Sequence, residues 1–183
     1  MMKPLRHGQR GLTIIELIVT VAILGILISL AAPSFNSFIA KRRIEGVMNE
    51  FVTDLQYARS EAVQRNANVR LTLGTGCYVV HLASATAVSC TQTTKSITPA
   101  AAELKTVQLA ASSTVQLAGG DGLAFIEFDF VRGSAAFNGT DTLSGKVAAT
   151  STIGDWQLTA AVQPVGRVRM CSPNGSLAYP STC

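Results

Sequence analysis

The sequence has few of the residues and patterns on which catalysis depends. It contains 2 histidines in 183 residues and only 14% charged residues, and it has no P-loop and no nucleophile elbow. The glycine-rich stretch 119–122 lacks the lysine and the spacing of a phosphate-binding loop, so we predict a turn there. His81 lies in an apolar stretch, where a position in a strand explains it. We therefore expect no enzymatic activity, no cofactor and no metal site.

Net charge is too small to indicate a partner. The formal charge is +4 at pH 7, but Lys3, Arg6 and Arg10 all precede a long apolar run. If residues 1–11 are removed, 12 basic and 11 acidic residues remain, a balance of +1. Overall charge therefore says nothing about nucleic acid, and only a local cluster of basic residues can do so.

The apolar residues concentrate in residues 12–32, with Glu16 as the one acid. As a helix this segment is about 31 Å long, which matches a hydrocarbon core of about 30 Å. Basic residues ahead of it keep the N-terminus in the cytoplasm and send the rest of the chain across the membrane. The alternative is a secretory signal peptide cleaved near Ser29-Leu30-Ala31. The length of the run, the carboxylate at its start and the helical pattern beyond it favour an anchor.

The helical pattern continues beyond this anchor. From Phe35 to Val63 apolar residues recur mostly at three- and four-residue steps, and charged residues fill the other side. Pro33 predicts a kink. We expect one helix of roughly fifty residues, with a transmembrane half at 12–32 and an amphipathic half at 33–64.

The stretch Gly11-Leu12-Thr13-Ile14-Ile15-Glu16-Leu17 resembles the class III signal of type IV pilins and type II secretion pseudopilins. The resemblance implies a leader peptide of residues 1–11, cleavage by a prepilin peptidase between Gly11 and Leu12, and N-methylation of Leu12, although the family usually has Phe at that position. An unpaired carboxylate in hydrocarbon is costly. The resemblance gives Glu16 a partner, the free α-amino group of Leu12 on this subunit or a neighbour, so that Glu16 selects assembled subunits.

The four cysteines form no CxxC pair and no pattern with metal-ligand spacing. An even number behind a membrane segment indicates two disulfides in an oxidising compartment. Of the three possible pairings we favour Cys77–Cys90 and Cys171–Cys183, because each closes a short loop. The alternative is four reduced, buried thiols.

After about residue 65, short β-rich runs separated by glycine, serine and threonine replace the helical pattern. The predicted strands are 69–73, 77–82, 105–109, 115–117, 123–130, 147–151, 156–162 and 166–170. Residues 83–102 are rich in Ala, Ser and Thr and are predicted to form a surface loop. We expect an α+β fold, in which a long N-terminal α-helix packs on antiparallel sheets of a periplasmic domain, residues 65–183. This length and strand pattern resemble the GspH/FimT group of minor pseudopilins and imply a type IV pilin-like fold.

One basic cluster lies near the C-terminal end. No Asp or Glu follows Asp155, whereas Arg167 and Arg169 lie in a predicted strand. As residues i and i+2 they point to one face about 6.6 Å apart, while Val168 and Met170 point to the other. Two guanidinium groups facing water suit the phosphate oxygens of a nucleic acid, which they bind weakly and without reading the sequence.

The stretch Gly166-Arg167-Val168-Arg169 also resembles the GRxR motif of the FimT minor pilins, which bind DNA during natural transformation. The resemblance gives Arg167 and Arg169 the contact with double-stranded DNA and Gly166 a supporting role. Further polar or stacking contacts are expected from Asn174, Ser176 and Tyr179. The alternative is a solvated edge strand, whose arginines discourage aggregation.

The function predicted from these resemblances is that of a DNA-binding minor pilin that supports natural transformation. Before assembly it is a single-pass inner-membrane protein with a periplasmic C-terminal domain, and afterwards it joins other pilins in a pilus or pseudopilus. The alternative is a structural minor pseudopilin of a type II secretion system, or a pilus-priming subunit resembling FimU, without DNA binding.

Overall fold

The computed structural model describes residues 11, 13–139 and 144–183 of the chain. Apart from Gly11, the predicted leader lies outside these residues, as does the predicted methylation site Leu12. The chain divides into two compact units, residues 1–38 and 39–183. Helix α1 (Ile14–Arg65) begins in the first unit and ends in the second.

In the first unit, α1 begins with a capped turn. The hydroxyl of Thr13 accepts a hydrogen bond of 3.3 Å from the backbone N–H of Glu16, and these two residues have the spacing of a capping box. A carboxylate in the first turn also interacts favourably with the helix dipole. The large apolar side chains between Ile14 and Leu30 are 48–82% exposed. Such a surface needs lipid or neighbouring subunits to cover it.

Among the residues that the structure describes, no helix by itself has the length and hydropathy of a membrane span. Two segments of α1, Ile14–Leu30 and Ser34–Arg65, satisfy the requirement together as a bent pair, by length and composition. The helix continues through Pro33 without ending. The kink at Pro33 and the anchor at 12–32 stay predictions.

The C-terminal half of α1 has one buried face, as the apolar pattern predicted. Its core side chains recur at three- and four-residue steps: Ile44, Met48, Phe51, Leu55, Ala58 and Ala62. The pattern also assigned Phe35 and Phe38 to this face, but they are 64% and 50% exposed, and so is Val63, at 58%. It lies about 100° round the helix from Ala62, beyond the edge of the buried stripe.

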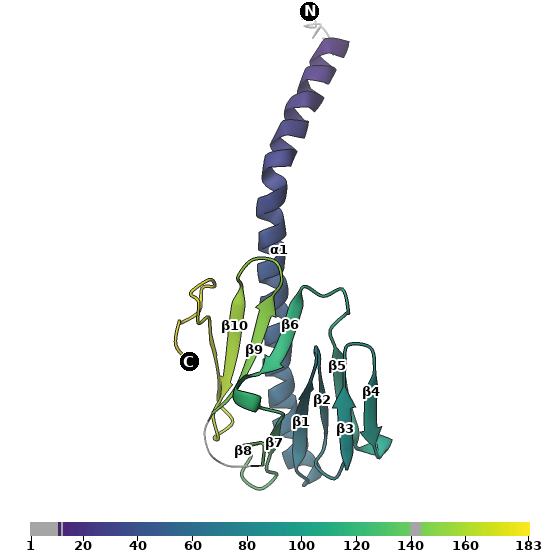
Figure 1. The fold of residues 1–183 in the computed structure, drawn as a ribbon, viewed down its shortest axis with the longest axis vertical. Coiled ribbons are helices and arrows are strands. Elements are labelled where there is room, and N and C mark those ends of the chain that lie inside the picture. The colour runs from purple at the N-terminus through teal and green to yellow at the C-terminus, as the bar shows by residue number, and fades with distance from the viewer. Residues whose placement is uncertain (1–10, 12, 140–143) are drawn as a thin grey trace, which may run out of the picture. The chain divides into compact units, whose positions relative to one another are not determined.

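Three antiparallel sheets complete the second unit. The strand order is β5-β2-β1-β7-β8 in the largest sheet, β11-β10-β9-β6 in the next and β3-β4 in the smallest. The two larger sheets lie across the C-terminal half of α1 (Figure 1). Side chains of α1 and of these two sheets form one hydrophobic core. This confirms the predicted α+β fold. The strands are β1 Val69–Gly74, β2 Cys77–Leu82, β3 Ala87–Cys90, β4 Lys95–Thr98, β5 Glu103–Gln108, β6 Val115–Gly119, β7 Phe125–Phe128, β8 Ala135–Phe137, β9 Gly145–Ser151, β10 Gln157–Val162 and β11 Val168–Cys171.

The prediction of a surface loop at residues 83–102 is wrong. This segment forms the hairpin β3/β4 and a short 3-10 helix, η1 (Ala100–Ala102). Most side chains of the hairpin are exposed, so no alternation of apolar and polar residues revealed it. Its burial comes from Val88, Cys90 and Ile97, which pack with Cys77 and Val79 of β2. The three-residue strand β8 also escaped the sequence pattern.

Both favoured disulfides are present. Cys77–Cys90 joins β2 to β3, and Cys171–Cys183 joins the end of β11 to the C-terminal segment. They close loops with sequence separations of 13 and 12. In the chain-entropy model, a loop of this size stabilises the folded state by roughly 3 kcal/mol.

Candidate nucleic-acid interface

A tight turn at residues 163–166 precedes Arg167 and the strand β11. The N–H of Gly166 donates to the carbonyl of Gln163 at 2.8 Å, and the N–H of Gln163 donates to the carbonyl of Arg167 at 2.8 Å. Gly166 has a φ of 78°, a left-handed conformation that glycine adopts without steric cost. Pro164 has the fixed φ that suits the second position of such a turn. The predicted supporting role of Gly166 therefore has a backbone reason.

Arg169 lies on the solvent side of the edge strand β11, and Arg167 directly precedes that strand. In the four-stranded sheet, the described neighbour of β11 is β10 alone. Both arginines are exposed, while Val168 and Met170 are partly buried against the core. The exposure of both arginines agrees with the shared face that their i, i+2 spacing predicted.

The strand register adds a third cation to this face. Arg169 pairs with Ala161 of β10, and Ala161 pairs with Lys146 of β9. Directly paired residues of antiparallel strands share a face, and strands are about 4.8 Å apart, so Lys146 lies about 10 Å from Arg169 across one alanine. Lys146 is exposed. Sequence analysis missed it, because nothing in the local pattern around Lys146 reveals a register that spans three strands.

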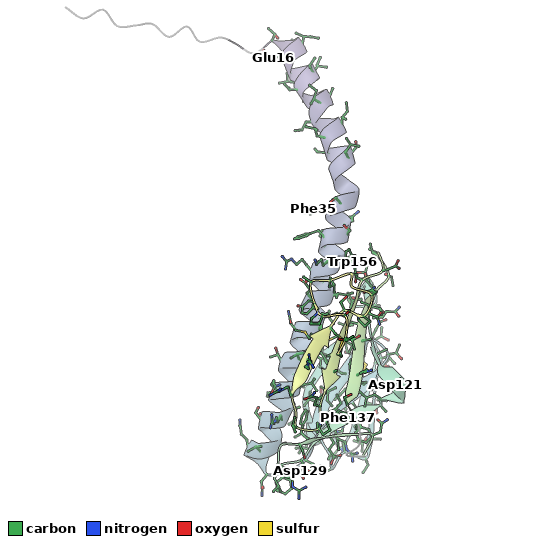
Figure 2. All side chains as sticks on the ribbon, turned by 90° about the vertical axis from the view of Figure 1, so that its left-hand side faces the viewer. Glu16, Phe35, Asp121, Asp129, Phe137 and Trp156 are labelled. Atoms are coloured by element: carbon green, nitrogen blue, oxygen red, sulfur yellow. A yellow bond between two sulfur atoms is a disulfide. The ribbon has the colours of Figure 1, made fainter. Side chains whose placement is uncertain are left out.

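An open cavity of about 500 Å³ lies on the same face. Thr159 and Cys171, a directly paired couple of β10 and β11, line it together with Lys146 and residues 181–183. Asp121 also lines the cavity and lies on the side of the domain away from α1 (Figure 2). This carboxylate makes the Lys146 end of the face less positive than the Arg167 end.

The C-terminal segment is held by its own hydrogen bonds. The buried hydroxyl oxygen of Ser172 lies 3.0 Å from the carbonyl of Gln157 and 3.1 Å from Oδ1 of Asn174, and its one hydrogen is donated to either acceptor. Asn174 Oδ1 also accepts from Ser176, and its amide nitrogen donates to a backbone carbonyl. Tyr179 is partly buried against the core. Contacts from Asn174, Ser176 and Tyr179 to a ligand stay a prediction.

Of the N-terminal site residues, the structure describes Gly11 and Glu16, and both are exposed. Glu16 stands in the first turn of α1, where Thr13 caps its N–H. Exposure of this kind leaves the Glu16 carboxylate accessible to a partner.

A helix with an exposed apolar start, whose amphipathic half packs on antiparallel sheets, defines the class of the pilins, and this chain is a minor pilin or pseudopilin. Residues 47–166 match the family of the type II transport protein GspH, and residues 6–32 match the prokaryotic N-terminal methylation motif. The chain belongs to the GspH family. Such proteins are structural subunits and not enzymes, in agreement with the expectation from the sequence.

Similar proteins support this class. The chain is 45% identical over 42 residues to the type IV major fimbrial protein FimA of Dichelobacter nodosus, which is 23% of this chain and 27% of FimA. It thus spans about a quarter of the length of the curated relatives that it matches. The type IV minor pilin FimU of Pseudomonas aeruginosa has a similar fold, with a TM-score of 0.52 and 18% identity over 78% of this chain and 98% of FimU.

Proposed function

We propose that this chain is a minor pilin of a type IV pilus that binds double-stranded DNA without sequence preference and supports DNA uptake in natural transformation. The observation that carries the proposal is an exposed pair of arginines, Arg169 on the edge strand β11 and Arg167 just before it. Among the described residues neither arginine forms an ion pair. Both guanidinium groups are therefore available to an external anion.

The chemistry of these side chains fits the phosphate backbone. A guanidinium group stays charged and donates two parallel hydrogen bonds to phosphate oxygens. Contacts to phosphates fix the position of a duplex but carry no sequence information. Affinity should fall as salt rises, because each neutralised phosphate releases counterions. No Asp or Glu follows Asp155, so no acidic side chain from the C-terminal strand repels a phosphate there.

Assembly is proposed to follow the pilin route. A prepilin peptidase cleaves between Gly11 and Leu12, Leu12 is methylated, and its α-amino group pairs with Glu16 of a neighbouring subunit. Before assembly, one pass of α1 anchors the chain in the inner membrane and its C-terminal domain lies in the periplasm. Mass spectrometry of the mature protein tests the processing, since an N-terminus at Ala32 would indicate ordinary secretion.

Fluorescence anisotropy with a labelled DNA duplex tests the binding. The full chain in a neutral detergent is compared with the double variant Arg167→Ala/Arg169→Ala and with Arg167→Lys/Arg169→Lys. We expect salt-sensitive binding by the wild type, intermediate binding by the lysine variant and little binding by the alanine variant. The proposal is contradicted if the wild type and the alanine variant bind the duplex with equal affinity. It is also contradicted if the affinity does not change with salt concentration.

A structural role without DNA binding is the second candidate. The match to the GspH family favours it, because that match indicates a filament subunit and says nothing about DNA. Deletion of the gene separates the two candidates. Loss of protein secretion or of pili, together with no DNA binding by the purified chain, supports the structural role.

A further inference from the structure

The guanidinium group of Arg59 on α1 lies against two glycines from different loops. A Cβ added to Gly133 would lie 3.0 Å from its Nε, and one added to Gly166 would lie 3.1 Å from its Nη1. Both glycines have a positive φ, 61° and 78°. Any other residue at either position would press on the Arg59 side chain, so the two glycines leave room for it.

The two loops that meet at Arg59 are joined to each other. The N–H of Ala135, after the β7–β8 loop, donates to the carbonyl of Pro164, in the β10–β11 turn, at 2.6 Å. Arg132 directly precedes Gly133, and Arg167 directly follows Gly166. Each glycine that touches Arg59 is thus one residue, about 3.8 Å between Cα atoms, from another arginine. We name Arg59, Arg132 and Arg167 the arginine tip.

Two acids lie near Arg132, because Glu127 and Asp129 line one small cavity with it. Asp129, in the β7–β8 loop, lies at the end of the domain where α1 ends (Figure 2), and its Oδ1 accepts the N–H groups of Val131 and Arg132 at 2.8 and 2.7 Å. Glu127 is already paired with Arg70, and Glu61 with Arg65, each at 2.5 Å.

Within the described residues, none of the three arginines of the tip has a carboxylate within ion-pair distance. Arg59 is partly buried, whereas Arg132 and Arg167 are exposed. Like charges that lie near one another repel, and an anion with several oxygens relieves that repulsion. Arg59 lies against the two glycines that adjoin Arg132 and Arg167, so three arginines without an ion pair among the described residues point to an external, polyanionic ligand.

We propose that the arginine tip extends the DNA-binding surface beyond β11, so that a phosphate backbone lying along Arg169 and Arg167 continues onto Arg132 and Arg59. This inference rests on the proposed function. It assigns contacts to α1 and to the β7–β8 loop, neither of which contains the GRxR-like stretch. Arg132 contacts a phosphate directly, and Arg59 both holds the two glycine turns and adds its charge beneath them.

The experiment measures the affinity of the full chain in neutral detergent for a labelled duplex over a range of salt concentrations. Arg132→Ala is the principal variant, because its exposed side chain can be removed without disturbing the core. Arg59→Gln removes the second charge, and Arg59→Lys keeps it. Arg43→Ala is the matched control: Arg43 is exposed on the same helix, about 24 Å along the axis from Arg59.

We expect Arg132→Ala and Arg59→Gln each to bind roughly five- to tenfold more weakly near 0.1 M salt and to lower the salt slope by about 0.9. Arg59→Lys should retain most of that slope, and Arg43→Ala should match the wild type. Thermal unfolding of each variant shows whether the fold is intact. Since Arg132 does not support the core, its result decides the matter even where Arg59→Gln unfolds.

Two outcomes overturn the inference. One is wild-type binding by Arg132→Ala and Arg59→Gln while Arg167→Ala/Arg169→Ala fails to bind, which leaves the proposed function in place and confines the site to β11. The other is an equal loss in Arg43→Ala, which shows diffuse attraction by charge instead of a defined surface. Wild-type binding by Arg167→Ala/Arg169→Ala instead refutes the proposed function, so the two failures are distinguishable.

Discussion

The hydroxyl of Tyr78 on β2 donates a hydrogen bond of 2.7 Å to Oδ2 of Asp54 on α1. Nζ of Lys105 on β5 lies 2.7 Å from the other oxygen of the same carboxylate. Asp54 and Tyr78 are 3% and 1% exposed, so the carboxylate depends on these partners for its stability. Burial, with Asp54 alongside, raises the pKa of Tyr78, and the phenol remains a donor at neutral pH. This network connects the helix to two strands of the largest sheet.

Tyr78→Phe should lower the free energy of unfolding by about 1–3 kcal/mol, because it leaves a buried carboxylate with one partner fewer. Urea denaturation followed by circular dichroism measures the change. The control is Tyr179→Phe, at a partly buried tyrosine outside this network, and its effect should stay within about 0.5 kcal/mol. Equal effects of the two substitutions would show that the hydrogen bond to Asp54 contributes nothing specific.

His81 makes stability depend on pH. It is 1% exposed in β2, with Nδ1 2.8 Å from the carbonyl of Leu82 and Nε2 2.8 Å from the hydroxyl of Thr72. A carbonyl only accepts, so Nδ1 carries the proton of the neutral ring and Nε2 accepts from Thr72. Burial lowers the pKa of His81. The unfolded chain therefore takes up this proton at a higher pH than the folded chain does.

The free energy of unfolding should consequently fall as the pH drops below about 6.5, the ordinary pKa of histidine, and continue to fall down to the folded pKa. Above that pH both states are neutral at His81 and the contribution is constant. Urea denaturation between about pH 7.5 and pH 5 measures this slope, and His81→Gln should flatten it. Glu103 affects stability chiefly below this window, because its ordinary pKa of 4.5 is already lower and the hydrogen bond from Lys95 lowers the pKa further. The same slope in both proteins would remove His81 as its cause.

Gly166→Ala tests the coupling between the β10–β11 turn and Arg59. The positive φ of Gly166 should cost an alanine about 1–2 kcal/mol, and the new Cβ would press on the Arg59 guanidinium. Gly175→Ala is the matched control, since Gly175 has a φ of 63° and no atom within 4 Å of the added Cβ. Both variants should melt a few degrees lower, whereas only Gly166→Ala should weaken binding of the DNA duplex. A similar loss of binding in Gly175→Ala would separate the arginine tip from the turn.

The sequence predicted the elements whose residues alternate or repeat, and it missed those that depend on packing across the fold. The amphipathic helix and most strands followed from their apolar spacing, although the strand predicted at 123–130 is the shorter β7. It ends at Phe128 because Asp129 starts a loop by accepting backbone N–H groups through its side chain. The β3/β4 hairpin had no such pattern, since its exposed Ala, Ser and Thr side chains pack little.

At the candidate site too, residues close in sequence were predicted, whereas residues brought together by packing were missed. Arg167 and Arg169 are two residues apart, so strand geometry alone predicts one face for both. Lys146 joins that face only through the register of β9, β10 and β11. Arg59 reaches Gly166 from a helix more than a hundred residues earlier in the chain. No local pattern carries either relationship, because both are set by how the helix and the sheets pack.

Glu16 has a position in the first helical turn and a proposed pairing role, and substitution separates the two. It has the capping-box spacing to Thr13, for which Gln serves as well as Glu, whereas the proposed pairing with the α-amino group of Leu12 requires the negative charge. Glu16→Gln therefore keeps the helix start and removes the charge. We expect it to reduce incorporation into filaments as strongly as Glu16→Ala does. Immunoblots of sheared filaments against the membrane fraction measure this incorporation.

Thr13→Val is the control for Glu16→Gln, because it removes the capping hydroxyl and leaves the carboxylate in place. It should lower stability by about 1 kcal/mol at most at this helix start and still allow assembly, since the charge pair is intact. Normal incorporation of Glu16→Gln together with poor incorporation of Thr13→Val would show the reverse: the cap, and not the charge, would then be what assembly requires of this turn.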